Sequence, residues 1–462
     1  MKRLKSELDK LEQELQSLDQ EQTKIEIPED PNIFCHKILG FTPTLYQQQF
    51  IASFKENRWI ALRWCRQSGK THIVSAMLLW YALRNPNIHI AVVGPSWRQT
   101  KKIISVINAF LTRLPKHVYN KPQKTKVSLK NGSVIEAFPN NPETIRGFTF
   151  HVIYCDEMNF IPNDADLYDA ILFTLGTTAG KFICSSTPGS NDSLFWKIFN
   201  DKAFEKYAKH HITWREAVEP SGPLKREMLE EIRLQYSADP WRWQREMEAV
   251  WVEDESSYFP LSLITQCIDG ELDYYDFHDT PEGEFYIGVD FGKKQDYSAV
   301  AVVQREGDML KLVHITDWQT FPLGTPYVSV IGYIKSLWDR WHTILGVYAD
   351  QTGVGEYIVE DMIKSGIANT TGITLTIPTK QDILGFLRQQ MQAGKLKIPY
   401  DRDLIAEINV EKYEVLKSGQ IQFSHPEGTH DDRLWALALA VYATKAVPPS
   451  GKGVVLIPHQ SD

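Results

Sequence analysis

Cysteine is scarce in this sequence of 462 residues, and no two of its five cysteines form a C-x-x-C pair. They are Cys35, Cys65, Cys155, Cys184 and Cys267. Such scattered cysteines favour neither a zinc site nor a disulfide framework, so we expect a protein of a reducing cytosol. Long apolar runs are also missing. The run "LWALALAVYA" (434–443) is shorter than the roughly 20 residues of a membrane helix, and no early apolar stretch with a basic flank predicts a signal peptide.

An excess of positive charge is missing as well, because 50 Lys and Arg face 58 Asp and Glu and the formal net charge is −8. This balance argues against a protein coated in basic residues. The basic residues are unevenly placed, however, since residues 58–130 hold fourteen Lys or Arg and no Asp or Glu. Such a segment is typical of a surface that meets nucleotide phosphates or a nucleic-acid backbone, although a solvated basic face would give the same pattern.

Apolar periodicity divides the first part of the chain into two segments. Residues 1–30 contain five leucines at alternating spacings of four and three, which predicts an N-terminal amphipathic helix. This helix could dock on a partner or pack on its own chain. Over residues 31–252, short apolar runs alternate with helical patterns. We therefore expect a domain with a parallel sheet and with active-site loops at the carboxyl ends of its strands.

The second part of the chain has a different order of elements. The acidic stretch "VEDESS" predicts a linker, which we place at 253–283. Residues 284–446 begin with three apolar runs in succession and then alternate between strands and helices, with one strand expected over 373–379. Three antiparallel strands followed by such alternation is the order of a ribonuclease-H-like nuclease domain. A Pro- and Gly-rich tail, 447–462, follows.

The stretch "RWCRQSGKTHIV" (63–74) ends like a phosphate-binding loop, but Trp64 stands where the pattern G-x-x-x-x-G-K-[ST] has its first glycine. A chance Gly-Lys-Thr in a loop is the alternative. The context favours a working loop, because an apolar strand precedes it and an amphipathic helix follows it. Lys70 is expected to reach the β- and γ-phosphates of ATP, and the Thr71 hydroxyl to bind Mg²⁺. The predicted ATP-binding residues of the loop are Arg66, Gln67, Ser68, Gly69, Lys70 and Thr71.

Two acids end the apolar strand in "FHVIYCDEMNF" and are expected to complete the ATP site. Asp156 can hold Mg²⁺ through water and Glu157 can polarise the attacking water, although a helix N-cap is the alternative. In "CSSTPGS", the hydroxyls of Ser186 and Thr187 could sense the γ-phosphate and couple its loss to movement. Upstream, Gln47 offers an amide that can pair with an adenine edge. Alternatively, Ser186 and Thr187 could belong to an ordinary turn, and Gln47 could lie on a solvent-exposed helix face.

Acidic residues also stand at the ends of strands and helices in the second part. They are Asp290 in "IGVDFG", Asp296 in "KKQDYSAV", Asp350 in "LGVYADQTG", and Asp431 and Asp432 in "HDDRLWALA". Carboxylates that converge there repel one another unless they share divalent cations. We predict a two-metal nuclease site in which Asp290 bridges, Asp350 and the Asp431–Asp432 pair complete the ligands, and Asp296 assists. Each acid could instead be a cap or turn residue, and which of Asp431 and Asp432 is the primary ligand stays open.

With these motifs in view, the chain resembles the large subunit of a tailed-virus DNA-packaging terminase. Phosphate loops of that family read R-Q-x-G-K-[ST] and often lack the first glycine, as "RQSGKT" does. "IRGFTFHVIYCDE" and "STPGSNDSLFWKIF" are similar to further motifs of the family, and the likeness extends over roughly residues 40–445. It implies that Arg66 senses phosphate within the loop and that Arg146 is a finger reaching a neighbouring subunit's ATP. Either arginine could instead pair with an acid.

The resemblance implies an α/β fold with an N-terminal P-loop ATPase domain, in which helices flank a parallel sheet, and a C-terminal RNase-H-like nuclease domain. It implies ATP-driven movement of double-stranded DNA into a procapsid, and cutting of concatemeric DNA with Mg²⁺ or Mn²⁺. The implied partners are double-stranded DNA, the procapsid portal, a small terminase subunit and further copies of the chain in a ring, with no membrane; isolated chains can be monomers. The expected location is the host cytoplasm, at the portal during packaging, and not the mature virion.

Two other functions fit parts of the sequence. A helicase-like ATPase with an attached nuclease, acting in repair or recombination, would need further arginine-bearing helicase motifs after "STPGS", and none is found. A binding or scaffold protein with decayed sites is disfavoured, because every expected catalytic position is occupied.

Overall fold

The computed structural model describes residues 26–237, 239–252, 256–292, 296–341, 343–353, 355–416 and 420–446. The five leucines of the expected N-terminal helix and the whole tail, 447–462, lie outside the described residues. The chain forms two compact units. Of the described residues, the first unit takes those within Met1–Met158, Ala165–Thr187 and Lys197–Arg226, and the second those within Asn159–Asp164, Pro188–Trp196 and Glu227–Asp462.

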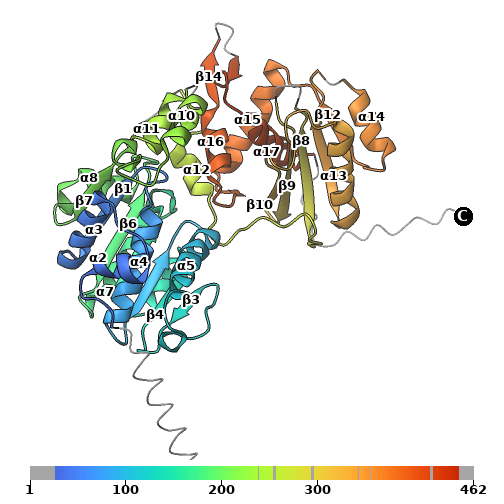
Figure 1. Ribbon diagram of the computed structural model, residues 1–462. Helices are drawn as coiled ribbons and strands as arrows, with labels where there is room; N and C mark the ends of the chain where they lie inside the picture. Colours follow the sequence, from blue (N-terminus) through green and yellow to red (C-terminus); the bar gives the residue numbers. More distant parts are fainter. Residues whose placement is uncertain are drawn as a thin grey trace, which may run out of the picture. The chain divides into compact units, whose positions relative to one another are not determined.

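The first unit is built on a seven-stranded sheet in the order β3-β4-β2-β5-β6-β1-β7 (Figure 1). The strands are β1 (Trp59–Trp64), β2 (His89–Val93), β3 (Lys126–Ser128), β4 (Val134–Phe138), β5 (Val152–Asp156), β6 (Lys181–Ser186) and β7 (Ala208–Ile212). All neighbours pair in parallel except β3, which runs antiparallel to β4 at the edge. The carboxyl ends of β5, β6 and β1 therefore lie side by side, which brings their loops together.

Helices cover this sheet and close its core. In the first unit they are α2 (Pro31–Ile33), η1 (Phe34–Ile38), α3 (Leu45–Glu56), α4 (Lys70–Arg84), α5 (Trp97–Leu111), η2 (Lys116–Val118), α6 (Pro142–Arg146), η4 (Lys202–Phe204) and α9 (Trp214–Ala217). The helices η3 (Met158–Phe160), α7 (Asp164–Gly176) and α8 (Leu194–Asn200) each cross a boundary between the units along the chain. The central strand β5 is buried along its whole length, as expected for a parallel strand covered on both faces.

The second unit contains a six-stranded sheet in the order β12-β11-β8-β9-β10-β13. The strands are β8 (Glu284–Asp290), β9 (Ala299–Glu306), β10 (Met309–Ile315), β11 (Ile344–Asp350), β12 (Thr370–Ile373) and β13 (Leu396–Lys397), and a separate hairpin pairs β14 (Lys412–Val415) with β15 (Ile421–Ser424). β8, β9 and β10 form the expected antiparallel succession, and β11 pairs with β8 in parallel. The expected α/β class and the expected order of the second unit's first strands are confirmed.

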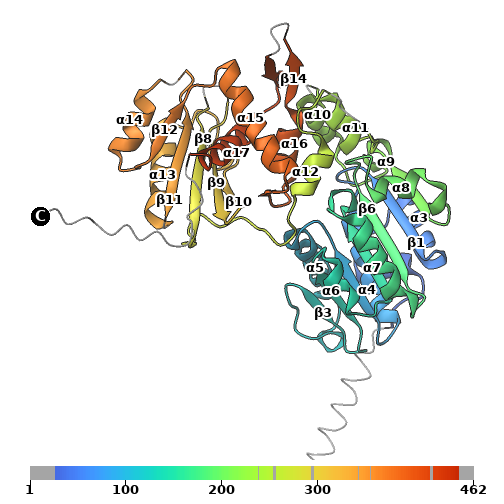
Figure 2. The same cartoon turned by 180° about the vertical axis from the view of Figure 1, so that it is seen from behind.

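Helices lie on both faces of this second sheet (Figure 2). The helices of the unit are α10 (Arg226–Gln235), α11 (Pro240–Glu246), α12 (Leu261–Cys267), α13 (Tyr327–Arg340), α14 (Tyr357–Lys364), α15 (Ile377–Gln392), α16 (Arg402–Val410) and α17 (Asp432–Ala443). α13 and α14 share a core with one face, and α17 lies across the other face, over β8, β9 and β11. At Gly288 a Cβ atom would overlap the backbone of Ala436 and Ala440, so only glycine lets α17 approach β8 this closely.

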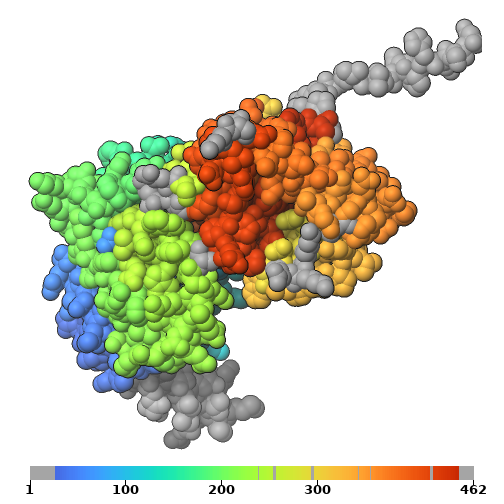
Figure 3. Space-filling view, turned by 90° about the horizontal axis from the view of Figure 1, so that it is seen from above, coloured from blue at the N-terminus to red at the C-terminus, as the bar shows by residue number. Residues whose placement is uncertain are grey.

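Three expectations about the second unit differ from the structure. The segment expected to be a linker contributes Tyr258, Phe259 and α12 to the buried core, because its apolar residues pack with α15 and α16. Residues 227–252, expected in the first domain, belong to the second unit, where Arg242 pairs with Asp403 at 3.3 Å. In Figure 3 the yellow-green residues of α10 and α11 adjoin the orange-red residues of α16.

The strand expected over 373–379 is the third difference. The strand β12 ends at Ile373, and Ile377 already begins α15. Thr376 caps that helix, since its hydroxyl accepts a hydrogen bond from the Thr379 backbone N–H, and a proline stands in the first helical turn. This capping chemistry prevails over the alternating apolar pattern. No helix in the described part of the chain is both long and apolar enough to cross a bilayer.

Candidate functional sites

The loop between β1 and α4 is held in shape by a left-handed glycine and by two hydrogen bonds, one of them from α3. Gly69 has a φ of 75°, a left-handed conformation that favours glycine, and it directly precedes the first residue of α4. The Ser68 hydroxyl donates to the Cys65 carbonyl oxygen at 2.7 Å, and the Tyr46 hydroxyl donates to the Ser68 carbonyl oxygen at the same distance. The loop therefore has a defined shape at the N-terminus of a fifteen-residue helix, the position at which protein backbones bind phosphate.

Lys70 and Glu157 form an ion pair across this site. The distance from Lys70 Nζ to Glu157 Oε1 is 3.2 Å, and each side chain is 8% exposed. The other carboxylate oxygen of Glu157 accepts from the Ser186 hydroxyl at 3.2 Å and from the Thr187 backbone N–H at 3.4 Å. The ends of β1, β5 and β6 thus bring together four of the residues that the sequence singles out, although Lys70 and Glu157 are 87 positions apart.

Asp156 lies beside this pair, fully buried, and accepts three hydrogen bonds from side chains. Its Oδ1 accepts from the hydroxyls of Tyr154 and Ser185, both at 2.8 Å, and its Oδ2 accepts from Gln99 Nε2 at 2.9 Å. Burial raises the pKa of Tyr154 well above its usual value, so the phenol keeps its proton and donates. Sequence reasoning missed these three donors. Only Tyr154 carried a signal, because it stands two positions before Asp156 on the same face of β5.

The other expected ATP-site residues lie around the loop. Gln67 is exposed, and Arg66 and Thr71 are half-buried. Gln47 Oε1 accepts from the Thr44 backbone N–H at 3.0 Å in a capping box that begins α3, so its amide oxygen is engaged within the helix start. Its Nε2 faces the loop, since a Cβ atom on Gly69 would come within 2.8 Å of it.

Arg146, expected as an arginine finger, is the last residue of α6. Its guanidinium forms an ion pair with the Glu143 carboxylate, one helical turn earlier, and its side chain is 51% exposed. Such exposed pairs within one helix stabilise it by only about 0.5 kcal/mol. The pair is the simple ion pair that the sequence left open as the alternative, and it leaves the side chain accessible.

The five acids expected at the nuclease site act on one another in the second unit. Asp290 ends β8 and Asp350 ends the neighbouring strand β11, while Asp431 and Asp432 open α17, which crosses β8. Burial raises the pKa of Asp290 well above its usual value, and the charges of Asp432, Asp350, Asp431 and Asp296 raise it further, in that order. The structure therefore gathers all five carboxylates at one edge of the sheet.

Asp431 occupies the N-cap position of α17, but its side chain makes no capping hydrogen bond. Instead, Trp435 Nε1 donates to Asp431 Oδ2 at 2.8 Å, and His425 Nε2 lies 3.4 Å from Oδ1. The alternative that Asp431 serves only as a cap is thereby disfavoured. Glu411, which the sequence did not single out, is almost fully buried nearby, and its pKa rises to about 9 through burial and the charge of Asp431.

Asp432 is buried beside Asp431. Its pKa rises to about 8 through burial first and then through the charges of Asp431, Glu407 and Asp296. His430 Nδ1 lies 3.6 Å from Asp432 Oδ2, and burial lowers the pKa of His430. Both acids of the pair therefore face the cluster, and neither is set apart as the primary ligand.

The chemistry of the cluster fits a hard divalent cation. Its donors are carboxylate oxygens, which suit Mg²⁺ or Mn²⁺ better than the nitrogen- and sulfur-preferring Zn²⁺. Within the described ranges, no three His, Cys, Asp or Glu side chains are already closed around a point that could hold one ion. Burial first, and then the charges of the neighbouring carboxylates, raise the pKa values of Asp290 and Asp432 in this crowded cluster.

Comparisons with known proteins bear on both units. Residues 64–266 match a family model described as "Terminase large subunit, T4likevirus-type, N-terminal", and residues 287–443 match one described as "Terminase RNaseH-like domain". The chain is 25% identical to the large terminase subunit of Thermus phage G20c over 454 residues, covering 87% of this chain and 88% of that protein. The corresponding protein of Thermus virus P23-45 is 24% identical over the same coverage.

Among solved structures, the large terminase nuclease of thermophilic phage G20c is 26% identical and covers 40% of this chain and 98% of that chain. Its TM-score of 0.34 is low, so the family follows from the sequence matches rather than from this superposition. The two family models follow one another along most of the chain, in the order in which the phosphate loop and the carboxylate cluster occur. The chain therefore belongs to the family of terminase large subunits, enzymes that join an ATPase to an RNase-H-like nuclease in viral DNA packaging.

Proposed function

We propose that this chain is both the motor and the nuclease of a packaging terminase. In this proposal the first unit hydrolyses ATP to move double-stranded DNA into a procapsid, and the second unit cuts the concatemeric DNA. The observation that carries the proposal is the presence, in one chain, of two separate polar sites. One is the Lys70–Glu157 pair with Ser186 and Thr187, and the other is the carboxylate cluster around Asp290.

In the motor site, Lys70 and the loop N–H groups would bind the phosphates, and Thr71 and Asp156 would hold a magnesium ion, which would supply neutralisation of their charge. In the present structure Lys70 pairs with Glu157 at 3.2 Å. Phosphate oxygens compete for the same ammonium group, so nucleotide binding frees Glu157 to accept a proton from the attacking water. The Ser186 hydroxyl and the Thr187 N–H, which hold Glu157, then transmit that change to the chain beyond β6.

In the nuclease site, Asp290, Asp350 and the Asp431–Asp432 pair would hold divalent cations, with Asp296 assisting. Divalent cations bound there would supply stabilisation of the attacking and leaving oxygens of a phosphodiester displacement. The protein's own contribution is to hold four carboxylates from three elements at one sheet edge, where their mutual repulsion favours cation binding.

The wider assembly is part of the proposal. Chains would form a ring on the procapsid portal in the host cytoplasm, fed by a small terminase subunit, and would leave before the virion matures. Arg146 is accessible enough to reach a neighbouring chain's ATP, which would make hydrolysis depend on assembly. The basic segment would make transient contacts to DNA phosphates through residues that include Lys116, Lys121, Lys124, Lys126 and Lys130.

The test compares the wild-type chain with Asp290→Ala and Glu157→Ala on plasmid DNA, with Mg²⁺ or Mn²⁺ present. We expect Asp290→Ala to lose cleavage and keep ATP hydrolysis, and Glu157→Ala to do the reverse. Unwinding of duplex DNA by the wild type would favour a helicase-like enzyme instead. Absence of both reactions, even with procapsids supplied, would favour a scaffold protein.

A further inference from the structure

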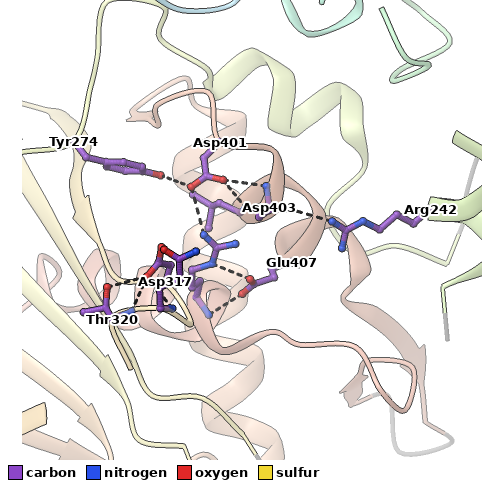
Figure 4. A network of polar contacts seen from close by, with 10 residues as sticks. Arg242, Tyr274, Asp317, Thr320, Asp401, Asp403 and Glu407 are labelled. Atoms are coloured by element: carbon purple, nitrogen blue, oxygen red, sulfur yellow. Dashed lines mark hydrogen bonds and ion pairs between the residues drawn. The ribbon is translucent and has the colours of Figure 1, made fainter. Parts of the chain in front are cut away.

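The start of α17 is held by a carboxylate from another helix (Figure 4). Glu407, on α16, accepts through Oε2 from the Arg433 backbone N–H at 3.0 Å and through Oε1 from Arg433 Nε at 2.8 Å. A second carboxylate, Asp401, lies 3.4 Å from Arg433 Nη1 and accepts from the Tyr274 hydroxyl at 3.3 Å. Arg433 is buried, so this arrangement fixes both its backbone and its side chain.

Glu407 takes over the bond that an N-cap residue ordinarily makes. Arg433 is the second residue of α17, and an aspartate at the N-cap usually accepts from the N–H of the second or third helical residue. Here Asp431 occupies the N-cap without making that bond, and the Arg433 N–H donates to Glu407 instead. The Asp431 carboxylate is therefore left to Trp435, to His425 and to the cluster around Asp290.

We propose that Glu407 is a positioning residue of the nuclease site: by capping α17 from outside, it keeps Asp431 turned toward the carboxylate cluster. This inference rests on the proposed nuclease function. It assigns a cause to the unusual side-chain position of Asp431, which the order of residues along the chain does not reveal. Removing Glu407 frees the Arg433 N–H, for which the N-cap residue Asp431 is the ordinary acceptor, and the Asp431 carboxylate then turns away from the cluster to cap its own helix.

The consequence is a loss of metal affinity rather than a loss of the cleavage step. Partners that orient metal-binding side chains typically change affinity or activity by about 10- to 100-fold when they are removed. Asp290 and Asp350, which stand on the strands β8 and β11, keep their places in Glu407→Ala, so high metal concentration restores cleavage. The ATP site lies in the other compact unit and serves as a control for folding.

The experiment uses the full chain and three variants: Glu407→Ala, Glu407→Gln and Asp401→Asn. Mg²⁺ and Mn²⁺ are titrated, first with plasmid DNA to follow cleavage and then without DNA to follow the rise in melting temperature. Glu407→Gln retains an amide oxygen that can accept from the Arg433 N–H. Asp401→Asn removes the second charge beside Arg433, and an asparagine still caps α16, where Asp401 accepts from the Asp403 N–H at 3.0 Å.

We expect Glu407→Ala to need at least about tenfold more metal for half-maximal cleavage. We also expect added metal to raise its melting temperature by less than that of the wild type. Glu407→Gln should recover most of the affinity, Asp401→Asn should stay near the wild type, and all three should hydrolyse ATP normally. If Glu407→Ala matches the wild type, or Asp401→Asn is equally impaired, the inference is wrong. A wild type that neither cleaves DNA nor responds to metal would remove the nuclease proposal itself, and the inference with it.

Discussion

Trp64 stands where the common phosphate-loop pattern has glycine, and we predict that restoring that glycine damages the protein. The indole is fully buried at the end of β1. It lies edge-on to Tyr46, with ring centres 5.0 Å apart, and to Phe50 at 6.2 Å. The Tyr46 hydroxyl donates to the Ser68 carbonyl oxygen. Because Trp64 packs against Tyr46, it also stabilises the shape of the phosphate loop.

The size of the effect follows from this packing. Replacing a buried Trp by Ala costs roughly 3–5 kcal/mol of unfolding free energy. A glycine within a strand adds about 0.5–1 kcal/mol. The buried indole N–H has no hydrogen-bond partner among the described residues. Removing this unpaired donor offsets the loss of unfolding free energy by about 1 kcal/mol. Trp64→Gly should therefore lose roughly 3–5 kcal/mol, a large share of the 5–15 kcal/mol that usually stabilises a domain.

Thermal inactivation of the ATPase measures this change in the first unit alone. For a domain of this size, such a loss lowers the midpoint by roughly 6–20 °C. Trp64→Phe is the matched control: it keeps an aromatic ring against Tyr46 and removes the unpaired N–H, so its midpoint should stay near the wild type. A Trp64→Gly chain as heat-resistant as the wild type, or a Trp64→Phe chain equally weakened, would refute the packing argument.

Three further predictions concern single groups. Without metal, the melting temperature should fall as pH rises from about 4 to 8, because Asp290 and Asp432 keep protons in the folded chain that the unfolded chain has released. Added Mg²⁺ should flatten this fall, and an equal slope with and without metal would contradict the argument. Tyr154→Phe should raise the Mg²⁺ needed for half-maximal ATPase, since Asp156 loses a donor at 2.8 Å; an unchanged Mg²⁺ titration would speak against this role. Thr376→Ala should cost about 1 kcal/mol in urea unfolding by uncapping α15, and a cost near zero would count against the cap.

Much of the architecture could be predicted from short-range patterns. The strand before the phosphate loop, the strand ending in Asp156 and the three antiparallel strands from Glu284 onward all occur where apolar periodicity indicated them. Each depends on residues within about ten positions of one another. The prediction of a strand over 373–379 was wrong for most of its length, since helix-capping chemistry at Thr376 competes with an apolar alternation there.

The sequence by itself determined the order of the elements, the phosphate loop and the acids that stand at strand and helix ends, because these features rest on local backbone preferences. Only the tertiary structure decided which side chains meet. The Lys70–Glu157 pair forms because β1, β6 and β5 are neighbours in the sheet, and the Arg433 N–H meets Glu407 because α16 packs against α17. Such contacts join residues far apart along the chain, and a local pattern contains no information about partners that only packing brings together.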